Sequence, residues 1–170
     1  RIDLVSTLIK AAKKRNILDE ILNKKDNDGN TPLHIATKYY NGHYSSFTGW
    51  GNATNYIDFK LIKLLVETGA KLDVQNTWFG DTPLHHAAIH GIIQSNFELA
   101  KYLFNKSKPV GNIKNKQGET PLDVVFGFIR EEPMYGDVEE VKEFIDMLSK
   151  NDWVEEFKRC LSNTSTNAHT

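Results

Sequence analysis

The sequence has one cysteine, Cys160, so it cannot form an internal disulfide. A chain of 170 residues without paired cysteines is typical of a reducing compartment, and we expect an intracellular, cytoplasmic protein. No apolar run approaches the roughly 18 residues of a membrane helix. The first residues also lack the basic and then apolar pattern of a secretory signal. We therefore expect no membrane segment. Because the chain does not begin with Met, we expect it to be a segment of a longer protein.

An excess of charge of one sign is also missing, since the formal net charge is −1. Residues 1–116 carry 16 Lys and Arg against 10 Asp and Glu, and residues 117–170 carry 5 against 12. The basic residues form only short clusters, at 13–15 and 24–25. Binding to a phosphate backbone normally needs a dense basic stripe, so we expect no nucleic acid partner. Both sets of charges are typical of solvated helix surfaces.

A catalytic set of residues is missing as well. The short run Gly49-Trp50-Gly51 lacks the preceding strand and the third glycine of a dinucleotide site. Cys160 has no histidine near it in the sequence that could activate a thiolate. The glutamate pairs at 131–132 and 139–140 are in segments where such residues ordinarily face solvent. We predict that the chain is not an enzyme and needs no cofactor.

What the sequence does contain is a motif that occurs three times. It reads Gly-x-Thr-Pro-Leu, with His next in the first two copies. Glycine accepts the positive φ of a tight turn, threonine can cap a helix with its hydroxyl, and proline fits the first helical position. Each copy therefore predicts the start of a helix. The structural residues of the motif are Thr31, Pro32, Leu33, His34, Thr82, Pro83, Leu84, His85, Thr120, Pro121 and Leu122.

A second helical pattern follows each copy of the motif. Apolar residues recur at helical spacing in residues 61–66, 99–104 and 138–148, and Gly69-Ala70 closes the first of these segments. The leucine of each motif and the small residues after it share one helical face, which lets neighbouring helices approach closely. Each unit thus reads helix, turn, helix and loop.

This pattern resembles the ankyrin repeat, whose Gly-x-Thr-Pro-Leu-His-x-Ala-Ala motif and closing Gly-Ala are matched at residues 29–36 and 61–72. The third copy departs from it, with Asp123 in place of the histidine. The resemblance implies an all-α solenoid of stacked helix-turn-helix units with hairpin-like connecting loops. It also implies that His34 and His85 hydrogen-bond to loop backbone. Partners of the family commonly bind the loop tips and the concave face of the first helices.

We predict one ankyrin-repeat domain over residues 2–161, followed by a loose tail. Its parts are a degenerate N-terminal repeat (2–27), three repeats that the motif marks (28–78, 79–116 and 117–150), a closing helix (151–161) and the tail (162–170).

The repeats are longer than the family's ~33 residues, since Thr31, Thr82 and Thr120 are 51 and 38 residues apart. We place the insertions at 39–56, around 92–96 and at 126–136. All three interrupt the connection between paired helices, so we expect polar loops that meet along one edge. Aromatic residues on such loops are typical of binding surfaces; alternatively they pack on each other and only cover a helix end. The candidate partner-binding residues are Tyr39, Tyr40, Tyr44, Phe47, Trp50 and Tyr135.

A further candidate is the loop 75–81, which the resemblance makes a projecting tip. It carries Trp78 and Phe79, where the family usually has small polar residues. An exposed Trp is a frequent interface anchor. The alternative is that either ring folds back on the neighbouring tip.

Three histidines invite a metal hypothesis, because His86 and His90 are an i, i+4 pair beside His85. The glutamate that follows the first histidine in zinc proteases is missing, and we assign the histidines a structural role. We predict no metal.

We therefore expect a monomeric module that binds another protein. The alternatives are a regulatory or substrate-recruiting segment of a larger multidomain enzyme and a small-ligand or metal site beneath the insertion 39–56. Lys, Asn and Ile are abundant, which suggests an AT-rich genome. Ankyrin arrays with irregular insertions are frequent in host-associated bacteria and viruses, so a host-directed effector that is delivered into a host cell is our hypothesis for its origin.

Overall fold

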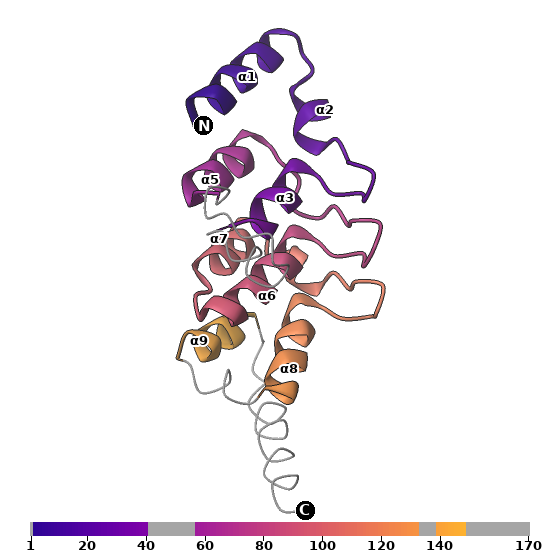
Figure 1. The fold of residues 1–170 in the computed structure, drawn as a ribbon, viewed down its shortest axis with the longest axis vertical. Coiled ribbons are helices and arrows are strands. Elements are labelled where there is room, and N and C mark those ends of the chain that lie inside the picture. The colour runs from indigo at the N-terminus through magenta and orange to yellow at the C-terminus, as the bar shows by residue number, and fades with distance from the viewer. Residues whose placement is uncertain (1, 41–56, 133–138, 149–170) are drawn as a thin grey trace, which may run out of the picture. The chain divides into compact units, whose positions relative to one another are not determined.

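A computed structural model describes residues 2–40, 57–132 and 139–148 of the chain. Within these ranges the protein is helical and has no strand, only an isolated bridge between Tyr40 and Ile57. The predicted all-α class is confirmed. The helices, shown in Figure 1, are α1 Ile2–Lys14, α2 Leu18–Asn23, α3 Pro32–Lys38, α5 Phe59–Thr68, α6 Pro83–Gln94, α7 Glu98–Lys106, the short 3-10 helix η1 Lys108–Asn112, α8 Pro121–Glu131 and α9 Glu139–Leu148.

The helices α3, α6 and α8 each begin at the proline of a motif copy. At α3 the Thr31 hydroxyl accepts the backbone N–H of His34, and the His34 ring accepts the N–H of Thr31. At α8 the same reciprocal cap joins Thr120 and Asp123. Such caps satisfy N–H groups that have no partner within the helix. The helix starts therefore have a local cause in the motif.

The chain divides into two compact units, Arg1–Pro83 and Leu84–Thr170. In the first unit α3 packs on α5, and α2 packs on both α1 and α3. The shared core consists of fully or nearly fully buried aliphatic side chains, among them Leu22, Leu33, Ala36, Ile62 and Leu65. Helix α5 ends at Gly69, whose φ of 118° is the left-handed conformation expected of a closing glycine.

Helix α1 fits the sequence interpretation only in part. The apolar side chains of Leu4 and Leu8 are 65% and 58% exposed, whereas Ala12 is buried. The apolar face of α1 is therefore mostly open, and α2 is the helix that packs on α1. A degenerate repeat over residues 2–27 implies a pair of helices, and α1 and α2 form such a pair.

In the second unit α7 packs on α9 and on η1. The ring of Phe97, which precedes α7, stacks on Phe144 of α9 with centroids 4.5 Å apart. A Cβ atom at Gly91 would lie 2.5 Å from the Phe97 ring, so α6 approaches this ring as closely as a glycine allows. These contacts hold α6, α7 and α9 around one aromatic pair.

The insertion around 92–96 and the described part of the insertion 126–136, residues 126–132, are not the polar loops that we expected. Helix α6 continues to Gln94, and α8 continues to Glu131. The reason is that Ile92, Phe126 and Ile129 keep the helical spacing of the preceding apolar residues and are buried. The predicted closing helix at 151–161, the tail 162–170 and most of the insertion 39–56 lie outside the described residues.

Candidate functional site

A common turn precedes α3, α6 and α8. Asp26, Asn76 and Asn115 hold equivalent positions, because one side-chain oxygen of each accepts two backbone N–H groups further along the loop. The distances are 3.0 and 2.8 Å at Asp26, 3.2 and 3.1 Å at Asn76, and 3.0 Å for both bonds at Asn115. We call residues 26–31, 76–82 and 115–120 the first, second and third tips.

The second tip is one residue longer than the other two. The backbone bond that closes each tip runs from Asp26 to Asn30, from Asn115 to Glu119, and from Asn76 to Asp81. The first two bonds span four residues and the last spans five. The additional residue lies between Asn76 and Gly80, where the sequence is Thr77-Trp78-Phe79. Both aromatic residues thus stand at the apex of an enlarged turn.

The first and second tips lie side by side in the first unit. The Thr77 N–H donates to the Asp28 carbonyl at 2.8 Å, and Lys25 Nζ donates to the Gln75 carbonyl at 2.9 Å. A Cβ atom at Gly29 would lie 2.5 Å from the Thr77 backbone nitrogen, so only glycine permits this approach. The two tips are therefore fixed in register at the backbone.

The side chains of Trp78 and Phe79 are 69% and 53% exposed. The indole Nε1–H of Trp78 donates to Asp28 Oδ1 at 2.8 Å. We expected either an exposed Trp78 or a ring that folds back on the neighbouring tip, and each expectation is met in part. The edge of the indole bonds to the first tip, while most of the side chain stays open to solvent. Asp28 orients a large aromatic surface without burying it.

Two of the motif histidines bond to the next tip in the sequence. His34 Nδ1 accepts the N–H of Thr31 at 3.1 Å, so the ring proton is on Nε2, which donates to the Asp81 carbonyl at 3.0 Å. His85 Nε2 lies 3.0 Å from the Glu119 carbonyl in the same way. Asp123 keeps the helix cap of the third copy, with Oδ2 accepting from Thr120 N at 2.7 Å, but a carboxylate does not extend to a further loop.

The comparison with known protein families agrees with this repeated geometry of tips, helix caps and histidine bonds. Residues 52–126 match the family model described as ankyrin repeats (3 copies). Residues 52–126 therefore carry ankyrin repeats. The first motif copy, at 29–36, lies outside the matched residues, yet it shares its tip with both copies inside, its reciprocal helix cap with the third copy and its histidine bond with the second.

The mouse protein "Ankyrin repeat and SAM domain-containing protein 6" is 34% identical to this chain over 104 residues. The aligned region covers 61% of the chain and 9% of the mouse protein. The chain thus spans about a tenth of the length of this ankyrin-repeat relative. Ankyrin repeats generally mediate contacts between proteins.

The other aromatic residues that we predicted to contact a partner differ in their exposure to solvent. Tyr39 is 39% exposed, with Lys38 Nζ 5.8 Å from its ring centroid. Tyr40 is only 5% exposed, and its ring lies 5.9 Å from that of Phe59. The structure therefore contradicts an accessible Tyr40, because this ring packs against α5. Tyr44, Phe47, Trp50 and Tyr135 lie outside the described residues.

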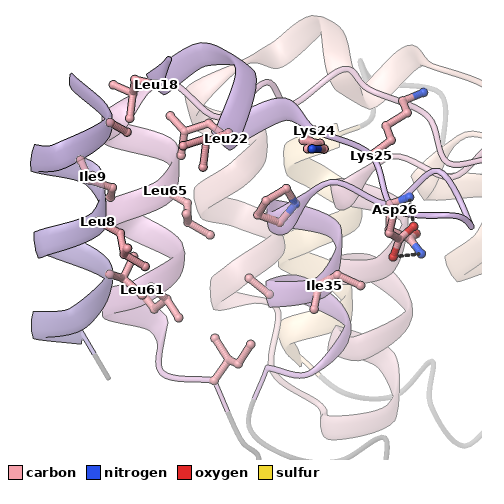
Figure 2. Close-up of a pocket in the computed structure, with 17 residues that line it drawn as sticks. Leu8, Ile9, Leu18, Leu22, Lys24, Lys25, Asp26, Ile35, Leu61 and Leu65 are labelled. Carbon is pink, nitrogen blue, oxygen red and sulfur yellow. Dashed lines mark hydrogen bonds between the residues drawn. The ribbon is translucent and has the colours of Figure 1, made fainter. Parts of the chain in front are cut away.

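The first unit also has an apolar groove of about 620 Å³ between α1, α2, α3 and α5. Figure 2 shows Leu8 and Ile9 of α1, Leu61 and Leu65 of α5, and Ile35 of α3 directed into it. Polar residues, Lys24, Lys25 and Asp26, line only one end. This groove is the open side of the helical core of the first unit and differs in chemistry from the polar and aromatic tips.

Asp26 stands out among the titratable groups of the tips. The N–H of Asn30 donates to its carboxylate and, together with that of Asp28, holds the pKa of Asp26 below its ordinary value of 3.8. The charged form thus favours the folded turn.

In the part of the chain that the structure describes, no group of three or more His, Cys, Asp or Glu side chains could hold a metal ion. The same ranges contain no helix that is long and apolar enough to cross a membrane.

The sequence analysis did not predict the role of Asp28 or the extra residue of the second tip. The extra residue could have been predicted, because Asp or Asn stands three residues before Gly29 and Gly118 but four before Gly80. No sequence pattern indicates the role of Asp28, because its bond to Trp78 joins residues 50 positions apart.

Proposed function

We propose that this chain is a protein-interaction module that binds its partner with a tip surface formed by Asp28, Trp78 and Phe79. The observation that carries the proposal is the enlarged second tip, which presents two large aromatic side chains to solvent. Exposed Trp residues are frequent binding hot spots, since one ring removes a large area from water on binding. Asp28 already orients the Trp78 indole, so less side-chain freedom is lost when a partner docks.

The remaining parts of the sequence interpretation belong to the same proposal. Tyr39, the part of the insertion that follows Tyr40 and the first helix of each repeat also belong to the proposed binding surface. In this proposal the protein acts inside a cell, as an effector that is delivered into a host cell. The relative's name pairs ankyrin repeats with a SAM domain, which supports a recruiting segment within a larger multidomain protein as the second candidate. Both candidates use the tip surface.

The proposal is tested by selecting binders to the immobilised chain from a displayed peptide library. Trp78→Ala should weaken the selected binders by at least about thirtyfold, a loss of about 2 kcal/mol, which is the lower bound for a hot-spot residue. Phe79→Ala should weaken them by a smaller factor. The unfolding midpoint should stay nearly constant, because both side chains are exposed.

Leu4→Ala is the matched control, since it also truncates an exposed apolar side chain of the first unit, away from the tips. It should change affinity by less than about twofold. Binders that keep their affinity for both Trp78→Ala and Phe79→Ala would remove the tip surface from the proposal.

A further inference from the structure

We propose that Trp78 and Asp28 together bind an arginine side chain of the partner protein. The guanidinium lies on the face of the indole and donates to the second oxygen of the Asp28 carboxylate. This inference rests on the proposed function, because it names the chemistry that the tip surface recognises.

The first support is that the Trp78 ring is both exposed and held in one orientation. Its side chain is 69% exposed, and the bond from Nε1 to Asp28 Oδ1 at 2.8 Å fixes its edge. Trp is the most favourable aromatic partner for a cation. Donation of the indole N–H to an anion also polarises the ring toward negative charge. The ring is thus prepared for a positively charged ligand.

The second support is a contrast with other aromatic rings of the chain. Lysine Nζ atoms lie 5.8, 4.4 and 5.4 Å from the ring centroids of Tyr39, Phe59 and Tyr102. Each of these lysines is a close neighbour of its ring in the sequence. No cation of the described ranges lies over Trp78. The chain's own lysines therefore occupy those rings and leave the indole face available.

The third support is the Asp28 carboxylate. Its Oδ1 accepts from Trp78, and no donor within the described residues meets its Oδ2. The neighbouring charges are already engaged, since backbone N–H groups hold Asp26 and the Gln75 carbonyl holds the Lys25 ammonium. Asp28 is thus the acceptor that this part of the tip surface offers to a partner.

The arrangement favours arginine over lysine and over acidic groups. A guanidinium is planar, stacks on aromatic faces and directs its donors sideways, whereas an ammonium is compact and strongly hydrated. Phe79, 53% exposed, adds an apolar contact for the aliphatic stem of the arginine. A carboxylate of the partner would be repelled by Asp28.

The direct test uses three blocked pentapeptides, Gly-Gly-X-Gly-Gly, in which X is Arg, Lys or Glu. The NMR signal of the Trp78 indole N–H is followed in the whole chain and is assigned by its loss in Trp78→Phe. The arginine peptide should shift this signal saturably, with a Kd on the order of 10 mM for so small a contact. The lysine peptide should bind at least about threefold more weakly, and the glutamate peptide should leave the signal in place.

The variant Asp28→Asn keeps an oxygen that can accept from the indole but removes the charge. It should weaken the arginine peptide by about three- to tenfold. Glu20→Gln is the matched control, because it removes an exposed carboxylate of the same unit from α2. It should leave the affinity unchanged.

An equal response to lysine, a response to the glutamate peptide or an unaltered affinity in Asp28→Asn would overturn the arginine assignment. The library selection separates this inference from the proposed function. Binders that depend on Trp78 but contain no arginine would refute the inference and leave the tip surface standing. A lack of dependence on Trp78 and Phe79 would refute the tip surface itself.

Discussion

The Nε2 atom of His34 lies 3.0 Å from the carbonyl oxygen of Asp81, 47 residues further along the chain. Both residues are buried, so the bond is protected from competition by water. It joins the first motif copy to the second tip. The bonds from Thr77 and Trp78 to Asp28 lie in the same pair of tips, and the tip surface therefore depends on this long-range contact.

Replacing His34 by Asn should destabilise the first unit by about 1–3 kcal/mol. Asn can still accept the Thr31 N–H, but it is too short to reach Asp81, whose buried carbonyl would lose one of its two donors and keep only the N–H of Asn76. Urea unfolding followed by circular dichroism measures the loss. Asp123→Asn is the control at the equivalent third position, where the cap is exposed and no further loop is held, and it should cost less than about 1 kcal/mol. Equal losses would show that the bond to Asp81 contributes nothing.

Two glycines with the same backbone conformation should respond differently to alanine. Gly29 and Gly118 have φ values of 77° and 80°, so either substitution costs about 1–2 kcal/mol through backbone strain. A Cβ atom at Gly118 meets nothing within 4 Å, whereas one at Gly29 would collide with Thr77.

Gly29→Ala should therefore lower the free energy of unfolding by at least about 1 kcal/mol more than Gly118→Ala. It should also shift the indole N–H signal of Trp78, because Asp28 precedes the altered residue. Matching stabilities for the two variants would mean that the tips separate at little cost.

Much of the fold could be predicted because its causes are local. Gly, Thr and Pro of each motif copy act within one turn of chain, and α3, α6 and α8 begin where those residues place them. The exposure of Trp78 could also be anticipated, since it stands at the apex of a loop. What escaped prediction depends on distant neighbours: Tyr40 is buried because its ring packs near Phe59.

The two insertions in the second unit were a different kind of error. The departure from a ~33-residue period predicts loops, but Ile92 and Ile129 continue the helical spacing of α6 and α8. Apolar periodicity was the better guide, because buried side chains extend a helix whatever the repeat length of the family.

The stability of the first unit should fall at acidic pH in a way that Asp26→Asn suppresses. The backbone N–H of Asn30 is the main cause of the lowered pKa of Asp26. A carboxylate with a lowered folded-state pKa contributes stability above its unfolded pKa, and this contribution is lost as the pH falls through the folded pKa.

Asn76 and Asn115 show that asparagine supports the same turn, so the variant should fold normally at neutral pH. Unfolding by urea between pH 2 and pH 7 should then show a shallower acid decline for Asp26→Asn than for the wild type. Asp19→Asn, an exposed change in α2, is the control. Parallel curves for Asp26→Asn and the wild type would contradict the role of the charge.

Neighbouring residues of α9 should differ widely in their importance. Phe144 is fully buried and stacks on Phe97, whereas Glu143 pairs with Lys101 at the surface. Phe144→Ala removes the aromatic contact and leaves a cavity, so it should cost about 3–5 kcal/mol. Glu143→Gln removes an exposed ion pair and should cost less than about 1 kcal/mol. Urea unfolding and hydrogen exchange of the α9 amides measure both effects. If Glu143→Gln also released α9, with exchange as fast as in Phe144→Ala, the ion pair and not the stacked rings would hold this helix.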